Sequence, residues 1–426
     1  MSLTKPPTIR TVTAFLNLCP NDFDVTWGSL FQSNVDTKIT NCVTLLRAME
    51  EVLVAAGYTV QTVRIATNPF GEWLLDESPN TDRTKKAKEE KLSRLDRLDK
   101  LLSQHQVGFC SVGPAKNSHE AKICPDIVSK SGRFSCSAIV DSGDVESADA
   151  AAETILKIAK LGEDSPDAPD HIKGGLGNFR FCAACSCKPF IPFFPGAKSQ
   201  ESGGSDDLKF ALGLENGSLA QKLLQDCKSI RKIRSEFREA MAQVLLPIQE
   251  MCEKVAKEKG AMYLGIDTSL NPSLDKDGSV AAALEELDEL QVFGGPGTLG
   301  AAAEITKAIQ TLPGIKLTGY CGLMLPVCED IRLASLASQG DGERLLRITD
   351  ILSISSVCGV GIDTVPVPGN CTKKELSSLI LDVAGIAGRW DKSLSCRVFP
   401  VPGKTSGEMT AFNSPFMVNS RIFQIS

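Results

Sequence analysis

Histidine is scarce in this sequence: three occur among 426 residues, and all three stand in polar surroundings. A Ser/His/Asp or Cys/His arrangement for nucleophilic catalysis therefore has little to draw on. Any acid–base chemistry must rest mainly on carboxylates and on a thiol.

Long apolar runs and an excess of basic charge are also lacking. No stretch approaches the about 18 apolar residues that a membrane helix needs, and the start, "MSLTKPPTIRTVTAFLNL", does not have the pattern of a secretory signal. The net charge is −6, so nothing favours nucleic acid electrostatically. We therefore expect no membrane association, no nucleic-acid partner and a cytoplasmic location. The oligomeric state is not decided by the sequence, and a homo-oligomer stays open.

Cysteine, in contrast, is frequent. The chain has 15 cysteines, an odd number, and most stand inside apolar runs. This pattern favours free buried thiols in a reducing compartment over a disulfide framework. In "FCAACSC" (181–187) three cysteines have the spacing of a zinc or iron–sulfur site, but the segment reads as an apolar strand without a fourth ligand. We interpret these cysteines as buried thiols and expect no metal site.

Short β-rich runs alternate with amphipathic helices nearly from end to end, which is typical of a largely parallel sheet with helices outside. About ten or eleven strands are too many for an eight-stranded barrel and suit a larger one. We expect one α/β domain over 1–426, with surface insertions near 161–178 and 195–207, where Gly, Pro, Ser and Asp are frequent. A boundary between two domains at those stretches stays open. The expected strands include 9–18, 59–67, 263–270, 290–295, 315–325 and 357–367.

Carboxylates at strand ends are the best candidates for proton transfer, because parallel α/β folds build their sites there. They include Asp267 in "GIDTSLNP", Glu329 in "PVCEDIR" and Asp363 in "GIDTVP". The alternative for each of them is that it caps a helix or fixes a turn.

A glycine-rich turn is a candidate anion site. "FGGPGTLGAAAEI" (293–305) formally fits the dinucleotide-binding pattern, and it follows an expected strand and opens a helix. No acidic residue ends the next expected strand, however. We favour a turn in which Gly295, Gly297 and Thr298 offer N–H groups to a carboxylate or phosphate, and Ser279 opens a similar helix start.

The stretch "ISSVCGVGIDTVPVPGN" (354–370) places Cys358 between small residues in a run that reads as a strand. Gly361 permits a close approach to the backbone. The thiol is either a packing group or an acid or nucleophile, whose pKa a helix N-terminus and a nearby cation would lower.

Several segments of this chain resemble uncharacterised protein family 0210, also called domain of unknown function 711. They are "GIDTSLNPS…DGSVAAALEEL", "GGPGTLGAA", "GLMLPVCED", "ISSVCGVGIDTVPVPG" and "RVFPVPGKTSGE". The resemblance implies a ten-stranded α/β barrel similar to that of pyruvate formate-lyase, with a finger loop inside. Those radical enzymes have the motif Arg-Val-x-Gly-aromatic near the end of the chain. Here Pro400 occupies the position of the glycine, so we do not expect radical chemistry.

The leading hypothesis is a cytosolic enzyme that acts on a small anionic metabolite inside the barrel. Asp267 or Glu329 would move the proton, with Asp363 beside them, and Cys358 would act as an acid or nucleophile. A non-catalytic sensor of an amino-acid-like ligand is the alternative, and a nucleotide-dependent oxidoreductase that uses the Gly295 turn is the third. The sequence does not identify a cofactor.

Overall fold

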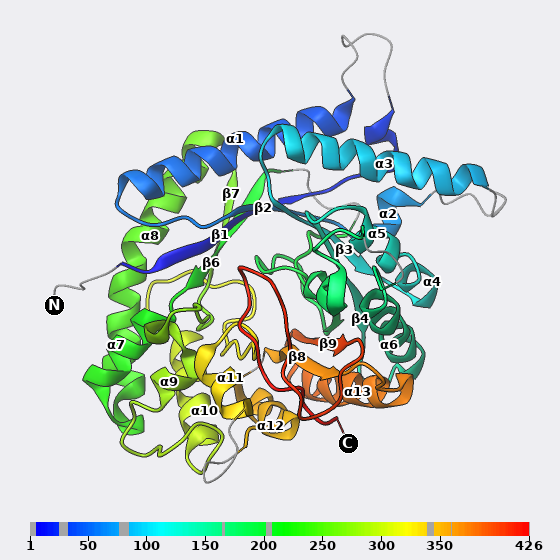
Figure 1. The fold of residues 1–426 in the computed structure, drawn as a ribbon. Coiled ribbons are helices and arrows are strands. Elements are labelled where there is room, and N and C mark those ends of the chain that lie inside the picture. The colour runs from blue at the N-terminus through cyan, green and yellow to red at the C-terminus, as the bar shows by residue number, and fades with distance from the viewer. Residues whose placement is uncertain are drawn as a thin grey trace.

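A computed structural model of the chain describes residues 6–24, 33–75, 85–163, 167–201, 207–338, 345–358 and 360–425; for 85–91, 276 and 358 it describes the backbone alone. Helices surround a central group of strands (Figure 1). The strands are β1 (Thr8–Leu16), β2 (Val63–Thr67), β3 (Phe109–Ala115), β4 (Phe134–Val140), β5 (Phe181–Cys185), β6 (Lys209–Glu215), β7 (Met262–Asp267), β8 (Gly361–Pro368) and β9 (Leu394–Val401). The α-helices are α1 (Asn34–Ala55), α2 (Gly71–Leu74), α3 (Lys85–Gln104), α4 (Ser118–Ala121), α5 (Cys124–Lys130), α6 (Val145–Ala159), α7 (Gly217–Cys227), α8 (Arg238–Lys259), α9 (Val280–Leu284), α10 (Thr298–Ile309), α11 (Ile331–Ser338), α12 (Ile348–Cys358) and α13 (Lys373–Trp390). Short 3-10 or π segments are η1 (Pro20–Phe23), η2 (Lys173–Arg180), η3 (Ile230–Lys232), η4 (Ile233–Phe237) and η5 (Lys276–Gly278).

One mixed sheet organises the described residues. Its nine strands have the order β7-β6-β1-β2-β3-β4-β5-β9-β8. The β1/β6 and β5/β9 pairs are antiparallel and all other pairs are parallel. Five central strands therefore run one way, and the two strands on each flank run the other way. The predicted α/β architecture is confirmed, with nine strands in place of ten.

The segment 316–328 lies between the two edges of this sheet without forming a regular strand. Leu317 and Leu323 each form an isolated bridge with the β7 side of the sheet, and Pro326 forms one with Asp363 of β8. The prediction of a strand over 315–325 is wrong as stated, because the turn at 318–322 interrupts the pairing. Among the described residues, no continuous strand pairing joins the edge strands β7 and β8, so the sheet is not closed.

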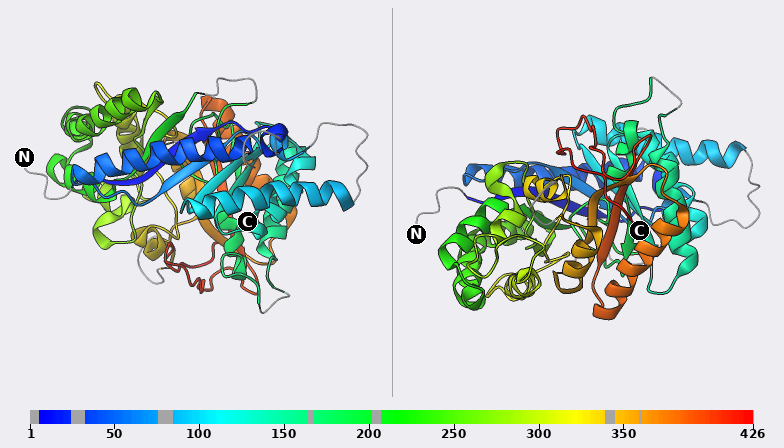
Figure 2. Two further views of the ribbon diagram at one scale, coloured as in Figure 1. Left: turned by 90° about the horizontal axis from the view of Figure 1, so that it is seen from above. Right: turned by 60° about the horizontal axis from the view of Figure 1, so that its bottom comes forward.

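Helices cover the outside of the sheet, as Figure 2 shows from two further directions. α13 illustrates how the sequence directs one of them. Thr372 precedes its first turn and accepts a hydrogen bond from the Glu375 N–H, while the Glu375 carboxylate accepts one from the Thr372 N–H at 2.7 Å. This reciprocal cap fixes the helix start. Leu376, Ile380 and Val383 then bury one face against the sheet.

The predicted strand over 357–367 is wrong in its first part. α12 continues to Cys358, and β8 begins only at Gly361. The buried positions Ile348, Ile351 and Ile354 recur every three residues, which is helical spacing that the β-branched composition concealed. Gly361 has φ of +100°, and a Cβ there would overlap the Ser395 carbonyl of β9. The backbone of the neighbouring strand β9 is thus the group that approaches Gly361 closely.

The loop 190–199 lies against the inner side of the sheet rather than at the surface. Pro192 accepts a hydrogen bond from Thr13 of β1, Ala197 accepts one from Ser111 of β3, and the Ser199 N–H donates to Thr67 of β2. Residues 195–199 are all buried, so the predicted surface insertion at 195–207 is wrong for them. Residues 202–206 lie outside the described residues. In 161–178, the described part is exposed or half-buried mainly over 161–171.

Candidate functional site

A small cavity of about 40 Å³ lies between the inner loop 190–199, the central strands β1 and β2, and the strands β8 and β9 of one flank. Its lining residues are of two chemical kinds, which we call the apolar wall and the polar or charged wall. The apolar wall consists of Phe193, Phe194, Pro195, Tyr320, Met324, Pro326 and Val360. The polar wall consists of Arg10, Arg64, Asn271, Glu329, Asp363, Ser395 and Arg397.

Arg397 of β9 is the centre of the charged wall. Its Nε donates to Asp363 Oδ1 at 2.6 Å, its Nη2 donates to Glu329 Oε1 at 3.0 Å, and its Nη1 donates to the Phe179 carbonyl at 3.2 Å. Burial opposes the charged form of Arg397, but Asp363 and Glu329 outweigh it and raise the Arg397 pKa. Arg397 therefore stays a cation and holds two predicted site carboxylates side by side.

Arg10 of β1 forms a second link in this network. Its Nη1 lies 2.5 Å from Glu215 Oε2, and its Nη2 lies 3.4 Å from Glu329 Oε2. Glu329 is thus shared between an arginine of the central strand β1 and one of the flank strand β9.

Arg64 of β2 differs from the other two arginines because it has no carboxylate partner among the described residues. Its Nε donates to Thr62 Oγ1 at 2.9 Å, and no described group accepts from Nη1 or Nη2. Its guanidinium carbon lies 5.0 Å and 4.7 Å from the ring centroids of Phe109 and Phe194. Burial, followed by repulsion from Arg10, holds the Arg64 pKa well below its ordinary value. The charge of Glu329 opposes this shift, but no carboxylate lies within ion-pair distance of the Arg64 guanidinium among the described residues.

The Glu329 carboxyl in the cavity lining has a raised pKa. Burial raises the pKa of its carboxyl, Asp363 raises it further, and Arg397, Arg10 and Arg64 oppose the shift. A raised pKa is what a group needs in order to exchange a proton near neutral pH.

The Glu329 pKa predicts a pH-dependent stability. The folded state holds the Glu329 proton more tightly than the unfolded chain does. This proton therefore adds to the free energy of unfolding in full below the ordinary glutamate pKa, and the addition is lost as pH rises through the raised pKa. Glu329→Gln should remove a slope of at most about 1.4 kcal/mol per pH unit in that window. Urea unfolding between pH 4 and pH 8 measures it, with the surface variant Glu304→Gln as control. Parallel pH profiles for Glu329→Gln and wild type would contradict the assignment.

Asp267 lies outside the cavity wall but fixes part of it. Its carboxylate accepts hydrogen bonds from Ser269, from the Tyr320 N–H at 2.8 Å and from the Cys321 N–H at 3.1 Å. Burial raises the Asp267 pKa, and these hydrogen bonds oppose the rise. Asp267 therefore orders the turn that brings the Tyr320 ring to the cavity, and proton transfer by it stays a prediction.

Ser279 opens α9 and is also remote from the cavity wall. Its Oγ donates to Asp330 Oδ1 at 2.6 Å, and Asp330 Oδ2 accepts from the Val280 N–H at 2.8 Å. The sequence predicts that a ligand anion binds at this helix start, but the Asp330 carboxylate occupies that position.

The turn with Gly295, Gly297 and Thr298 lies on another part of the molecule. Residues 290–295 form turns, so the predicted strand there is wrong and the dinucleotide pattern lacks the strand that it requires. Gly297 has φ of +95° and precedes α10, and Thr298 Oγ1 accepts from the Gly294 N–H at 3.0 Å. This turn does not contribute to the cavity wall.

Cys358 ends α12, and its side chain lies outside the described residues. Two positions further on, Val360 lines the cavity. The 14 cysteines whose side chains are described are free thiols. Within the described ranges, no three His, Cys, Asp or Glu side chains are grouped as metal ligands. The predicted role of Cys358 stays a prediction.

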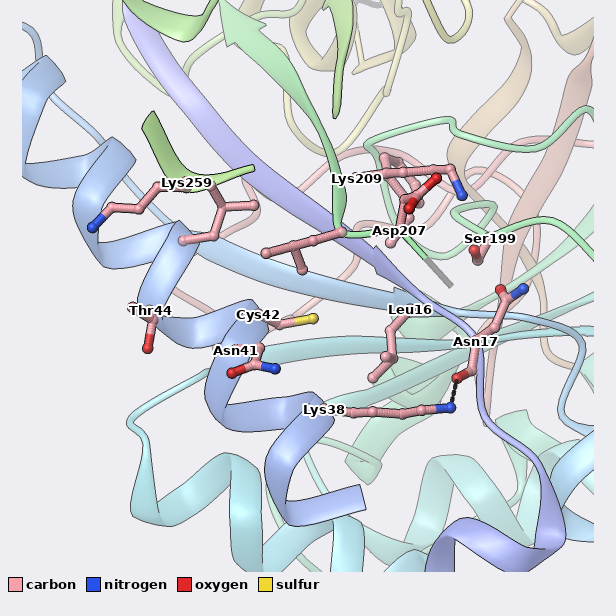
Figure 3. Close-up of a pocket in the computed structure, with 13 residues that line it drawn as sticks. Leu16, Asn17, Lys38, Asn41, Cys42, Thr44, Ser199, Asp207, Lys209 and Lys259 are labelled. Carbon is pink, nitrogen blue, oxygen red and sulfur yellow. Dashed lines mark hydrogen bonds between the residues drawn. The ribbon is translucent and has the colours of Figure 1, made fainter. Parts of the chain in front are cut away.

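A larger pocket of about 410 Å³ lies between α1, the end of β1 and the start of β6 (Figure 3). Lys38 points its ammonium at the Asn17 carbonyl and also pairs with Asp22 at 3.0 Å. The cationic group of Lys38 is therefore already neutralised. The small cavity is the better candidate site because predicted carboxylates and an unpaired cation meet there.

The fold and the cavity define an α/β protein whose mixed sheet contributes to a small charged cavity. The chain belongs to the family described as Uncharacterised ACR (DUF711), whose model matches residues 1–413. No helix in the described part of the chain has the length and apolar character needed to cross a membrane.

Curated relatives carry the name UPF0210 protein. One from Pyrobaculum islandicum is 28% identical over 235 residues, which are 54% of this chain and 51% of that protein. One from Neisseria gonorrhoeae is 28% identical over 62% of this chain and 55% of its own length. The matches thus span about half the length of these relatives. One from Methanococcoides burtonii is 26% identical over 95% of this chain and 87% of its own.

Among solved structures, the chain is similar to an anaerobic ribonucleotide reductase from Thermotoga maritima in complex with dATP and CTP. The TM-score is 0.34 at 11% identity, over 91% of this chain and 74% of that one. The same enzyme with citrate in its active site gives a TM-score of 0.32 at 12% identity, over 91% and 80%. At these TM-scores the similarity supports no conclusion about chemistry.

Three site arginines, Arg10, Arg64 and Arg397, are not among the residues predicted from the sequence. Each stands alone in an apolar strand, in "TIRTVT", "VRIAT" and "CRVFPV". A single charged residue in the middle of a buried strand is the signal that could have identified them, because burial of such a group requires a partner.

Proposed function

We propose that the protein binds a small monoanion in the cavity beside Arg64 and acts on it as a cytoplasmic enzyme. The observation that supports this proposal is the buried Arg64 guanidinium, which has no carboxylate partner among the described residues. A ligand carboxylate would accept two hydrogen bonds from its planar fork.

Charge balance supports a single negative charge on the ligand. Arg10 is paired with Glu215 at 2.5 Å, and Arg397 with Asp363 at 2.6 Å. Glu329 is the remaining acid, and it pairs with Arg397 at 3.0 Å and with Arg10 at 3.4 Å. Arg64 is thus the one guanidinium of the cavity lining that has no carboxylate at ion-pair distance among the described residues, and a monoanion would pair with it.

In this proposal Glu329 transfers the proton. Its carboxyl lines the cavity, and Arg397 and Arg10 orient both of its oxygens. We infer that the segment 316–328 takes the place of a tenth strand, supported by its bridges to both sides of the sheet. A barrel closed in this way would shield the reaction from water.

A non-catalytic sensor of a small ligand is the second candidate. It is favoured by the ion pairs of Asp363 and Glu329 with Arg397, which suit rigid recognition as well as proton transfer. A nucleotide-dependent oxidoreductase is not proposed, because the strand that the Gly295 turn would need is absent from the described residues.

Calorimetric titration with acetate tests the proposal, with methylammonium as the control of opposite charge. We expect acetate to bind and methylammonium not to bind. Ionic strength is kept constant so that nonspecific screening does not contribute. If neither probe binds, or both bind equally, the proposal fails. Conversion of a bound short carboxylate, followed by NMR and lost in Glu329→Gln, separates the enzyme from the sensor.

A further inference from the structure

The charged wall offers a hydrogen-bond acceptor as well as a cation. We propose that the ligand is a short carboxylate with a hydrogen-bond donor, a hydroxyl or an ammonium group, on the carbon next to the carboxylate. This inference rests on the proposed function and adds the substrate class to it.

Asp363 supplies the acceptor. Its Oδ1 accepts from Arg397 Nε at 2.6 Å, while its Oδ2 has no hydrogen-bond partner among the described residues. Asp363 is 8% exposed and lines the cavity. A donor on a ligand in the cavity would give this oxygen a hydrogen bond.

Asn271 adds a second acceptor on the same wall. Its Nδ2 donates to the Leu214 carbonyl at 3.2 Å, which fixes the orientation of the amide. Its Oδ1 has no described partner, and the residue lines the cavity. Arg64 thus offers only donors to a ligand, whereas Asp363 and Asn271 offer acceptors.

The size of the cavity limits the ligand to a few non-hydrogen atoms. A volume of about 40 Å³ exceeds what one water occupies, roughly 10–15 Å³ by the same kind of measure. Glycolate and glycine are the smallest molecules that join a carboxylate to an adjacent donor, so they are suitable probes. Acetate has the carboxylate alone.

The test compares affinities by calorimetric titration of the full chain with glycolate, glycine and acetate. In wild type we expect glycolate, glycine or both to bind at least about tenfold more tightly than acetate. The tighter of the two identifies the donor as hydroxyl or ammonium. Methoxyacetate, which has an oxygen but no donor at that carbon, should bind no better than acetate.

Asp363→Asn tests the acceptor itself. Arg397 Nε–H should keep the amide oxygen at the Oδ1 position, so the amide NH₂ replaces Oδ2 and donates where the carboxylate accepted. The measured quantity is the ratio of glycolate or glycine affinity to acetate affinity, which should fall to about one. Asp149→Asn, a surface carboxylate paired with Lys373, should keep the wild-type ratio.

Equal affinities for acetate, glycolate and glycine in wild type would overturn the inference and leave the proposed function standing. The same holds if methoxyacetate matches glycolate, a result that does not depend on folding of any variant. A ratio that Asp363→Asn leaves unchanged also overturns it. If no carboxylate binds at all, both the inference and the proposed function fail.

Discussion

Arg397→Met is expected to lower the free energy of unfolding by about 3–5 kcal/mol at pH 7. The guanidinium of Arg397 contacts Asp363, Glu329 and the Phe179 carbonyl from within a buried strand. Methionine retains most of the apolar volume but leaves two buried carboxyl groups without their shared cation. The loss should shrink as pH falls, because protonation of Glu329, whose pKa burial raises, removes part of the uncompensated charge. Urea unfolding at pH 7 and pH 4.5 measures both effects.

The control is Arg234→Met, which removes the exposed ion pair between Arg234 and Glu304. Exposed pairs contribute about 0–1 kcal/mol, so this variant should remain close to wild type. The triple variant with Arg397→Met, Glu329→Gln and Asp363→Asn should recover part of the lost stability, because its buried groups are neutral. A loss for Arg397→Met as small as that for Arg234→Met would contradict the central position of Arg397.

The sequence predicts the architecture better than it predicts individual elements. Alternation of β-rich runs and helices indicated the α/β class, and the family assignment is confirmed over residues 1–413. Residues 290–295 and 315–325 are apolar and rich in glycine, so composition alone does not distinguish a strand from a chain of buried turns. In α12 the helical spacing of the isoleucines competes with their β propensity, and tertiary packing decides.

Part of the candidate site could be predicted in the same way. Glu329 and Asp363 come from segments 34 positions apart, and Arg397 joins them in the structure. An expected position at strand ends pointed to them, whereas Asp363 lies near the start of β8 and Glu329 follows the irregular segment 316–328. The sequence could not show which of these segments meet. The inner loop was missed because its glycines and prolines resemble a surface turn, although hydrogen bonds from Thr13 and Ser111 satisfy its buried carbonyls.

Arg64→Met is expected to abolish acetate binding without destabilising the protein. Two charge-assisted hydrogen bonds between a guanidinium and a carboxylate contribute about 3 kcal/mol together, so the affinity should fall about 100-fold or more. The free energy of unfolding should stay level or rise, because the buried Arg64 cation has no described carboxylate partner and a methionine thioether packs well between Phe109 and Phe194. Calorimetric titration and urea unfolding give the two quantities.

Arg180→Met provides a matched control. Arg180 also lies over an aromatic ring, 5.7 Å from the Phe179 centroid, and its Nε donates to the Gly132 carbonyl at 2.8 Å, but it does not line the cavity. Its loss should leave acetate affinity unchanged and cost stability, the reverse of Arg64→Met. Arg64→Lys should fall between wild type and Arg64→Met in affinity, because an ammonium retains the charge without the planar fork. Acetate binding that survives Arg64→Met would place the anion elsewhere, whereas a large loss of stability in that variant would make Arg64 a structural cation.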